Sequence, residues 1–427
     1  MLLAVPAGNA HAATITVTNC NDSGAGSLRS AVASAASGDT IDMSTLTCRG
    51  IDLTSGAIAI TQRDLSLDGG PSNLMKVDAG RRSSVFRHSG TGWLRIRRMN
   101  IANGFYSSSI DSYGGCLYSA GKIELLTSKV HGCRVSGTAS EYGGGGGIYA
   151  EGSVRVIYSW VTSNTATLAY GGGIVTRAGL TVNHSHISDN RASFLGGVNS
   201  QRLIARYSTF SGNDGGAVYS VNGDMIIANS TISGNTDVTQ AHYPVVYWFA
   251  GPGLGSASII DSTISGNAAS QIEIVGLVGA GPKSIVNSTI AFNQGSESCD
   301  DPENAVTVLV GGGSTLFDST VISNNSCGGN PQYSVGGTGF PDPSVLVGAN
   351  NLITTPSALT LPADTITADP HLAPLADNGG ATKTHSLPPD SPAIDMGNNE
   401  AGLEYDQRDR GFPRVKGTQA DIGAFER

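Results

Sequence analysis

The hydrophobic and polar positions in the middle of the chain follow one short repeated phrase. It reads Ser, any residue, an apolar residue, two further residues and Asn. The copies are Ser159–Asn164, Ser185–Asn190, Ser208–Asn213, Ser230–Asn235, Ser262–Asn267, Ser288–Asn293 and Ser319–Asn324, and a variant at Ser128–Cys133 ends in Cys. Successive copies lie 22 to 32 residues apart. Repeats of this length are typical of solenoids, in which each repeat forms one coil that stacks on the next.

Each repeat also contains a glycine cluster and a short alternating run. Examples are Gly143–Gly147 followed by Val154–Val156, and Gly171–Gly173 followed by Leu180–Val182. Alternating apolar and polar residues indicate strands with one buried face, and no window shows a sustained helical period. The sequence therefore predicts an all-β fold, a right-handed parallel β-helix over 51–350. Each coil should contain three short strands, at about 4.8 Å per coil.

The repeated Asn predicts a ladder along the solenoid. An amide side chain carries donors and acceptors, so each Asn can bond to the Asn above and below it, as in cross-β stacks. Asn also tolerates left-handed backbone angles in a turn. The apolar residue three positions before each Asn should form a matching stack in the core. These positions are predicted to be structural.

The N-terminal region differs from the repeats. Residues Ser27–Ser37, bounded by Gly26 and Gly38, predict one short helix that caps the open end of the solenoid within 13–50. Residues 1–12 end in Ala10-His11-Ala12, the small-x-small pattern that precedes a signal peptidase cut. We interpret 1–12 as the remnant of a signal peptide whose start lies upstream. The alternative is a disordered alanine-rich end.

Composition and charge narrow the function classes. The chain has 427 residues with 58 Gly, only 14% charged residues and a net charge of −9. This length exceeds what one compact core supports, which favours an elongated repeat. The negative charge argues against a general nucleic-acid binder, which needs a basic surface. No apolar run reaches the roughly 20 residues needed to span a bilayer, so no transmembrane segment is predicted.

Six cysteines support export. They fall in local pairs along the chain: Cys20 with Cys48, Cys116 with Cys133, and Cys299 with Cys327. In a solenoid, residues one coil apart are stacked neighbours, so each pair could reach disulfide distance. Zinc is the rival interpretation, but the sequence contains no CxxC and no His residues spaced around the Cys. We therefore predict three disulfides, no metal site and no cofactor.

The two ends of the chain carry a family resemblance. The opening Ile15–Arg29, with Gly38–Ile41 after it, resembles bacterial surface β-helix proteins of the "CSLREA" type. The segment 351–427 resembles the "choice-of-anchor Q" domain, and the middle is similar to the repeats of polymorphic outer-membrane proteins. The motifs of the Q-like segment are Asp369-Pro370, Ala376–Gly380, Ser391–Asp395, Asp406–Arg408 and Asp421–Glu426. The resemblance implies an exported parallel β-helix, often displayed at the cell surface, without implying a known reaction. No anchor follows the Q-like segment, so we expect free secretion as readily as surface attachment.

Basic and aromatic residues cluster in three successive coils of an otherwise acidic chain. They are Arg155, Tyr158, Arg177, His184, His186, Arg202, Arg206 and Tyr207, and Tyr158, His184 and Tyr207 share one column. Such a face suits a polysaccharide, since rings stack on sugars and Arg grips carboxylates. A lyase of acidic sugars would also need a cation and a proton acceptor, for which Arg177, His184, Arg206 and Tyr207 are candidates. The alternative is a solvated face with scattered charges.

Pectin-degrading enzymes share the pectin-lyase-like solenoid, so their hydrolytic chemistry is a second possibility. It requires two carboxylates flanking a water. Asp261 and Asp318 stand just before the repeated Ser in what we expect to be one column, with Asn287 between them. Two coil steps would separate them by roughly 10 Å, at the outer edge of the inverting range. The alternative is that this column simply prefers small polar turn residues.

Two further segments fall outside the repeat. Val238–Gly255 contains Tyr243, Tyr247, Trp248 and Phe249, and we expect an irregular aromatic loop, either a lid over a binding groove or a packing plug. Tyr247 and Trp248 are therefore ligand-binding candidates. The charged residues Asp406, Arg408, Asp409, Arg410, Arg414, Asp421 and Glu426 are expected to form ion pairs that tie the final segment over the last coil.

The sequence favours a secreted or surface binding protein, adhesin-like, whose lateral face meets an acidic polysaccharide or cell-surface glycan. It rests on the regular repeat, the resemblance and the lack of a clean active site. The alternative is a carbohydrate-active enzyme, a lyase or hydrolase of an acidic polysaccharide. A purely structural spacer is a third possibility.

Overall fold

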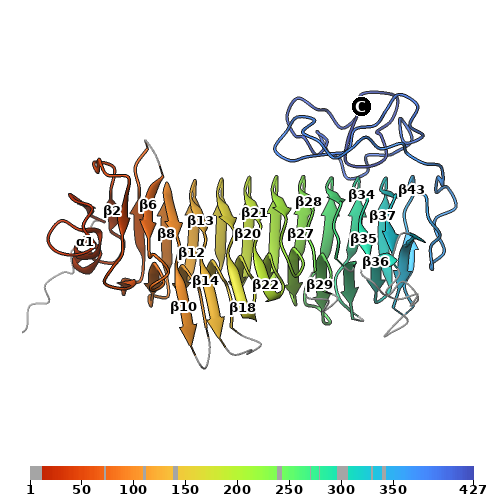
Figure 1. The fold of residues 1–427 in the computed structure, drawn as a ribbon. Coiled ribbons are helices and arrows are strands. Elements are labelled where there is room, and N and C mark those ends of the chain that lie inside the picture. Colours follow the sequence, from red (N-terminus) through yellow and green to blue (C-terminus); the bar gives the residue numbers. More distant parts are fainter. Residues whose placement is uncertain are drawn as a thin grey trace, which may run out of the picture.

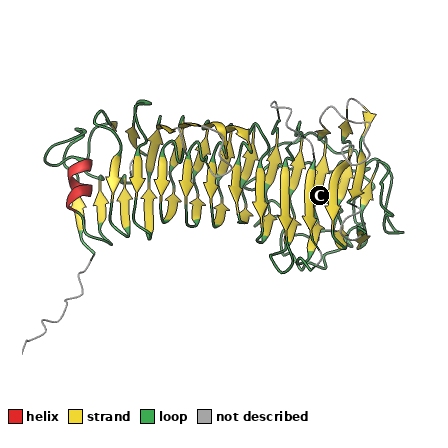
Figure 2. Ribbon diagram, turned by 90° about the horizontal axis from the view of Figure 1, so that it is seen from below, coloured by secondary structure: helices red, strands yellow, loops and turns green. Residues whose placement is uncertain are grey.

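The chain forms one long parallel β-helix with a compact segment packed against its side (Figure 1). The computed structural model describes residues 12–427, except 72–73, 109–111, 138–142, 238–242, 270, 278, 296–305, 328–329 and 339–342. Residues 1–11, most of the signal-peptide remnant proposed for 1–12, lie outside the described residues. Figure 2 shows the single described helix at one end and the successive coils of strands beyond it.

Sheet A has 13 parallel strands and begins in the N-terminal region. Its strands are β1 (Thr14–Thr16), β2 (Thr40–Asp42), β5 (Leu65–Asp68), β8 (Trp93–Arg97), β12 (Lys122–Leu126), β16 (Val154–Ile157), β20 (Gly179–Asn183), β24 (Arg202–Arg206), β27 (Met225–Ala228), β30 (Ala257–Ile260), β33 (Lys283–Val286), β37 (Ser314–Asp318) and β42 (Val345–Val347). Alternate residues point inward, such as Leu94 and Ile96 of β8, and both are fully buried. The alternation of apolar and polar residues predicted from the sequence thus places every second side chain in the core and the others toward solvent.

Sheet B has 12 parallel strands and follows sheet A within each coil. Its strands are β3 (Gly50–Asp52), β6 (Met75–Asp78), β9 (Met99–Ala102), β13 (Lys129–His131), β17 (Trp160–Thr162), β21 (His186–Ser188), β25 (Thr209–Ser211), β28 (Thr231–Ser233), β31 (Thr263–Ser265), β34 (Thr289–Ala291), β38 (Val321–Ser323) and β43 (Leu352–Ile353). The central residue of each short strand is the apolar residue of the repeated phrase, and it is buried from Val130 through Ile322.

Sheet C has 11 parallel strands and closes each coil. Its strands are β4 (Ile58–Ile60), β7 (Phe86–His88), β11 (Leu117–Ser119), β15 (Ile148–Ala150), β19 (Ile174–Thr176), β23 (Val198–Ser200), β26 (Val218–Val221), β29 (Val246–Ala250), β32 (Ile272–Gly276), β36 (Val306–Gly311) and β41 (Tyr333–Gly337). The glycine clusters precede these strands because neighbouring coils approach closely there. A Cβ on Gly197 would lie 2.1 Å from the Ala217 carbonyl oxygen.

Two small sheets project between sheets B and C. Sheet D contains β10 (Phe105–Ser108), β14 (Arg134–Gly137), β18 (Thr165–Tyr170) and β22 (Arg191–Phe194), and extends away from the solenoid body in Figure 1. The other contains β35 (Gln294–Gly295), β39 (Ser326–Cys327) and β40 (Asn330–Pro331). All described strand pairs are parallel except β39 with β40.

The predicted Asn ladder is present. The Asn190 Oδ1 accepts from the backbone N–H of Asn164 at 3.1 Å and from its Nδ2 at 3.0 Å, and the same pair of bonds repeats coil by coil. Each Nδ2 also donates to a backbone carbonyl, as Asn235 does to Phe210 at 3.0 Å. The ladder runs through Asn164, Asn190, Asn213, Asn235, Asn267, Asn293 and Asn325, and Cys133 occupies the position before Asn164.

The prediction of Asn324 as the last member of this ladder was wrong by one residue. Asn293 bonds to Asn325, whereas Asn324 is exposed and has a φ of 57°. The strand register explains this, because Thr289 pairs with Val321 and Ile290 with Ile322. The phrase in this coil therefore starts at Thr320, and Ser319 belongs to the turn before it.

A second ladder occupies the other corner, between sheets A and B. The Ser185 backbone N–H donates to Ser208 Oγ at 3.2 Å, and Ser185 Oγ donates to the Asn183 carbonyl at 2.7 Å. The pattern runs along Ser128, Ser159, Ser185, Ser208, Ser230, Ser262, Ser288 and Thr320. The residue before each of these has a positive φ, as at Tyr158 and His184. The repeated Ser thus satisfies the backbone of a left-handed turn.

The N-terminal helix is confirmed. Helix α1 spans Leu28–Ser34, and the N-cap Ser27 Oγ accepts from the Ser30 backbone N–H. Its buried residues Leu28, Ala31 and Val32 join the solenoid core, so the helix covers the first coil.

Two of the three predicted disulfides are present, Cys20–Cys48 and Cys116–Cys133. The third predicted pair includes Cys299, which lies outside the described residues. Cys116 and Cys133 are only 17 residues apart. The expectation that they stack one coil apart was therefore wrong. The disulfide joins the end of β13 to the start of β11 within one coil.

The C-terminal end folds back. Residues 354–366 cover the last coil, where Leu359 and Leu361 pack against the core and the Ala358 N–H donates to the Val335 carbonyl. The C-terminal segment, defined here as 367–427, then runs back along sheet B and contains no helix or strand (Figure 1). It is held by side chains on the outer face of that sheet: Thr231 bonds to Lys383, Thr263 to Gln407, Ser265 to His385, and Thr289 to Ala424.

The expectation that the C-terminal charges tie this segment over the last coil was wrong. They lie on the lateral face and mostly pair within the segment. The Asp406 carboxylate pairs with Arg408 at 2.6 Å, and Glu426 accepts from the Asp421 and Lys416 backbone N–H groups, both at 2.8 Å. An irregular segment makes few backbone–backbone hydrogen bonds, so these charged side chains satisfy its backbone N–H groups instead.

The ladder generates a first prediction. Asn235→Ala should lower the free energy of unfolding by about 1–3 kcal/mol, because the Asn213 N–H and amide lose their buried acceptor. Urea denaturation measures this, with Thr181→Ala on the outer face of sheet A as the control. An unchanged midpoint for Asn235→Ala would contradict a structural role for the ladder.

Candidate functional site: a basic face with an aromatic ridge

The outer face of sheet A carries an unusual concentration of cations. Among five consecutive strands, β8, β12, β16, β20 and β24, all but β20 present cations outward: Arg95, Arg97, Lys122, Arg155, Arg202 and Arg206. Glu124 is the one acidic residue in these strands. We call these six residues the basic face. The register fixes its rows: Arg95 lies beside Glu124 and Glu124 beside Arg155, one coil apart.

Neighbouring carboxylates neutralise part of this charge. Glu124 lies 3.7 Å from Arg155 and 3.9 Å from Arg97, and Asp224 lies 3.4 Å from Arg202. Within the part of the chain that the structure describes, Arg95, Lys122 and Arg206 have no carboxylate within 4.0 Å. The face therefore keeps a positive excess on a chain whose net charge is −9.

Trp93 lies at one edge of the basic face, among its cations. The Arg155 guanidinium is 4.7 Å from the indole centroid, the Lys122 ammonium 5.4 Å and the Arg95 guanidinium 5.7 Å. Cations over an indole face are attracted by its quadrupole, so one ring holds three like charges close together.

An aromatic ridge borders the opposite edge of the basic face. Tyr158, His184 and Tyr207 follow directly on β16, β20 and β24, in the left-handed turns to sheet B. Their ring centroids are 4.9 Å and 4.8 Å apart, so the expected column is present. Because the rings cover one another's faces, they offer mainly edges, hydroxyls and a ring nitrogen. Tyr158, at the end of the stack, is 52% exposed.

A second pair of rings lies next to the ridge on sheet B. His186 stacks parallel on Trp160 with centroids 6.0 Å apart, and Trp160 is 40% exposed. Burial lowers the pKa of His186, which favours the neutral ring at pH 7. Burial, with a smaller contribution from Asp409, raises the pKa of Tyr207. This corner of the solenoid is thus aromatic beside a basic face.

Arg177 lies apart from the basic face. It follows β19 in the turn from sheet C to sheet A and pairs with Glu151 at 3.5 Å. Of the binding residues predicted from the sequence, the structure brings together seven: Arg155, Tyr158, His184, His186, Arg202, Arg206 and Tyr207. Tyr247 lies on sheet C, and Arg177 lies in the turn that follows it.

The prediction of an irregular aromatic loop at Val238–Gly255 was wrong for the part of this segment that the structure describes. Residues Val246–Ala250 form β29 in the middle of sheet C, and residues 238–242 lie outside the described residues. Trp248 points inward, is fully buried and donates its indole N–H to the Gly223 carbonyl at 2.7 Å. It cannot contact a surface ligand. Tyr247 points outward and stacks on Tyr219 at 4.5 Å.

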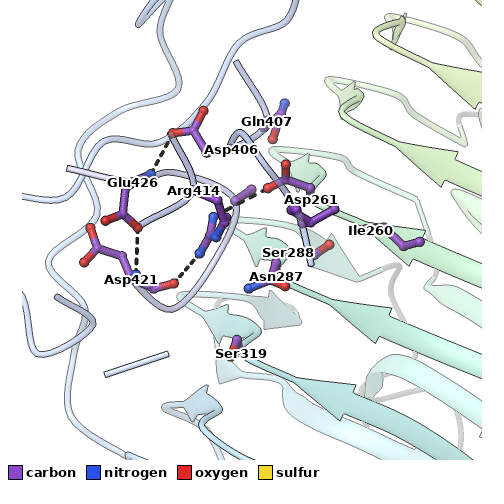
Figure 3. A network of polar contacts seen from close by, with 12 residues as sticks. Ile260, Asp261, Asn287, Ser288, Ser319, Asp406, Gln407, Arg414, Asp421 and Glu426 are labelled. Carbon is purple, nitrogen blue, oxygen red and sulfur yellow. Dashed lines mark hydrogen bonds and ion pairs between the residues drawn. The ribbon is translucent and has the colours of Figure 1, made fainter. Parts of the chain in front are cut away.

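The proposed carboxylate pair does not form. Asp318 pairs with Val286 in the ladder of β33 and β37, so it lies one residue outside the column of Asp261 and Asn287, which Ser319 continues. The C-terminal segment covers both. Asp261 is fully buried, and its carboxylate lies 3.5 Å from Arg414 (Figure 3). Asp318 accepts from the Asn398 amide at 2.9 Å. These carboxylates dock the segment and have no access to a substrate.

Sequence reasoning missed Arg95, Arg97, Lys122 and Trp93. They precede the first clear copy of the repeated phrase, so nothing in the local pattern aligns them with Arg155 or Arg206. Their spacing of two within β8 was the available signal, because it places Trp93, Arg95 and Arg97 on one face.

The described residues contain no group of three His, Cys, Asp or Glu side chains that could hold a metal ion. Among those same residues, no helix is long and apolar enough to cross a membrane.

Comparisons with known proteins add little to this description. No protein-family model matches the chain, and no curated protein matches it. Among solved structures, the crystal structure of pectate lyase Pel9A is similar, with a TM-score of 0.46 and 15% identity over 98% of each chain. The in-register stacking of parallel strands in sheets A, B and C establishes the β-helix independently of this similarity.

The buried pair generates a second prediction. Arg414→Met should destabilise the docked C-terminal segment by about 3–5 kcal/mol near neutral pH, because it removes the ion-pair partner of the buried Asp261 carboxyl. Limited proteolysis of the segment and thermal unfolding measure this. Arg410→Met, at an exposed position four residues away, is the matched control.

The destabilisation caused by Arg414→Met should be smaller at acidic pH than at neutral pH. Burial raises the pKa of Asp261 well above its ordinary value of 3.8, and Arg414 opposes that shift. Below the ordinary value the folded and unfolded chains are both protonated. As the pH rises from there to the raised pKa, the unfolded chain loses its proton first, and stability falls. The defect of Arg414→Met should therefore shrink on acidification, and a defect independent of pH would contradict this account.

Proposed function

We propose that this protein binds an acidic polysaccharide or cell-surface glycan along the basic face and the aromatic ridge, as an exported, adhesin-like β-helix. The observation that carries the proposal is the basic face itself, with six cations and one carboxylate on five consecutive strands. Like charges gathered on one face repel. An anionic polymer lying along the solenoid would relieve that repulsion across several coils at once.

The aromatic ridge fits the same ligand. Tyr158 and Trp160 are exposed, and a sugar ring can pack its apolar face on such side chains while its hydroxyls meet Tyr and His polar edges. Arg95 and Arg206 would supply charge-assisted hydrogen bonds to carboxylates. Charge and rings lie side by side, as recognition of an acidic sugar requires.

Export is part of the proposal. Two disulfides support an oxidising compartment, and the small-x-small motif at Ala10–Ala12 fits signal peptide cleavage. The resemblance of both ends to surface β-helix proteins of the CSLREA and choice-of-anchor Q types points in the same direction. Surface attachment would place the basic face where glycans are met.

The alternative is a lyase or hydrolase of an acidic polysaccharide. Burial of Asp261 and Asp318 removes the carboxylates considered for hydrolysis. A lyase using Arg206, His184 and Tyr207 would act on the same ligand at the same corner. Incubation with acidic and neutral polysaccharides separates the possibilities, because reducing ends or unsaturated products would establish an enzyme.

A third prediction tests binding. The double variant Arg95→Ala and Arg206→Ala should bind an acidic polysaccharide at least about tenfold more weakly, equivalent to about 1.4 kcal/mol. Arg134→Ala, an exposed cation on sheet D, is the matched control. Affinity electrophoresis in gels containing pectate, alginate or hyaluronate measures the effect. Added salt should weaken binding by the wild type, since exposed charges are screened beyond about 8–10 Å.

Tyr158→Ala with Trp160→Ala tests the ridge in the same gels, with the exposed Tyr333→Ala as its control. Retardation that neither salt nor either double variant changes would overturn the proposed site. Absence of retardation by every acidic polysaccharide would overturn the function.

A further inference from the structure

The outer face of sheet C carries a row of tyrosines that is interrupted once. In register, coil by coil, the row contains Tyr118, Tyr149, Val175, Asn199, Tyr219 and Tyr247. Tyr118 and Tyr149 stack with planes 7° apart, and Tyr219 and Tyr247 with planes 8° apart. Two smaller residues in the middle therefore leave a gap in an otherwise continuous stack.

A pocket of about 240 Å³ opens beside Val175 and Asn199, the two residues of this gap, and extends toward the turn from sheet C to sheet A. Its lining includes Tyr170, Val175, Arg177, Asn199, Gln201 and Asn222. Tyr170 comes from the end of β18 in sheet D and is held by stacking on Phe194 at 5.1 Å. Pockets for drug-sized ligands span roughly 300–1,000 Å³, so this one has room for a smaller molecule, about one ring.

The lining combines apolar surface with uncharged polar groups and carries little net charge. Arg177 and Glu151 form an ion pair at 3.5 Å beside the pocket. Asn199, Gln201 and Asn222 are amides that can both donate and accept hydrogen bonds. Sugar hydroxyls also do both, so vicinal hydroxyls match amides and an Arg–carboxylate pair. Tyr170 and Val175 add an aromatic and an apolar surface for the ring carbons.

The same lining disfavours an anion. A ligand carboxylate at Arg177 would have to compete with Glu151, and the two like charges would repel. This distinguishes the pocket from the basic face, where cations outnumber carboxylates. The two surfaces also belong to different sheets, with Arg177 in the turn between them.

We propose that this pocket binds one neutral sugar ring, such as a hexose residue of a glycan. The site is separate from the basic face, and the proposal does not rest on the function proposed there.

Saturation-transfer difference NMR tests the proposal with the methyl glycosides of glucose, galactose and mannose, and with methyl glucuronide as the anionic counterpart. Wild-type protein should transfer saturation to at least one neutral glycoside, and more strongly than to the glucuronide. Asn199→Tyr should abolish the transfer, because it extends the tyrosine row by one ring at the edge of the pocket without removing the charged pair.

Glu273→Tyr is the matched control. Glu273 stands next to Tyr247 in the same row, so the change adds a ring at the far end of the stack, outside the pocket. It should keep the wild-type signal. Gln201→Ala, at an exposed position, should weaken the signal at least about threefold if Asn199→Tyr fails to fold.

Three results would overturn the proposal: no transfer to any neutral glycoside, transfer that survives in both Asn199→Tyr and Gln201→Ala, or a preference for the glucuronide. The Arg95→Ala and Arg206→Ala double variant should leave this signal unchanged. Loss of polysaccharide retardation with retained glycoside transfer would separate the two sites.

Discussion

The side-chain hydrogen bonds at the two left-handed corners of each coil are the constraint on which the rest of this structure depends. The chain must turn sharply between sheets A and B and again after sheet B, and both turns bury backbone N–H groups that no strand partner reaches. The Ser column satisfies the first turn and the Asn ladder the second. Unpaired buried groups would cost about 1–3 kcal/mol each, so these side chains stabilise the coils from Ser128 onward.

This constraint also determines what can be built on the surface. Once the corners lock the register, each outward position lies one strand spacing from its equivalents in neighbouring coils, and side chains form rows. Rows of rings stack on one another, as at Tyr158, His184 and Tyr207. Rows of like charge need interruption, which Glu124 provides between Arg95 and Arg155. A row broken by smaller residues becomes a pocket, as at Val175 and Asn199.

Sheet B shows a different use of the same geometry. Its outer row continues from Trp160 and His186 into Thr209, Thr231, Thr263 and Thr289, and the hydroxyls of the last three bond to the C-terminal segment. The segment has no periodicity and no strands, so it depends on those hydroxyls, a small apolar cluster and the buried Asp261–Arg414 pair. It divides sheet B into a covered half and an open half that begins at His186 and Trp160, beside the basic face.

The sequence by itself determined the parallel β-helix, the Asn ladder as far as Asn293, the capping helix, two described disulfides and the ring column, because each follows from a local pattern or from the spacing of one repeated phrase. Only the tertiary structure placed Asn325 in the ladder, Trp248 in the core, Asp318 out of the Asp261 column and the C-terminal segment against sheet B. It also joined Arg95, Arg97 and Lys122 to Arg155 and Arg206. The physical reason is that coils vary from 22 to 32 residues, and a shift of one residue turns a strand's side chains from solvent to core. Register between distant residues is therefore decided by packing of the whole coil, which no local pattern contains.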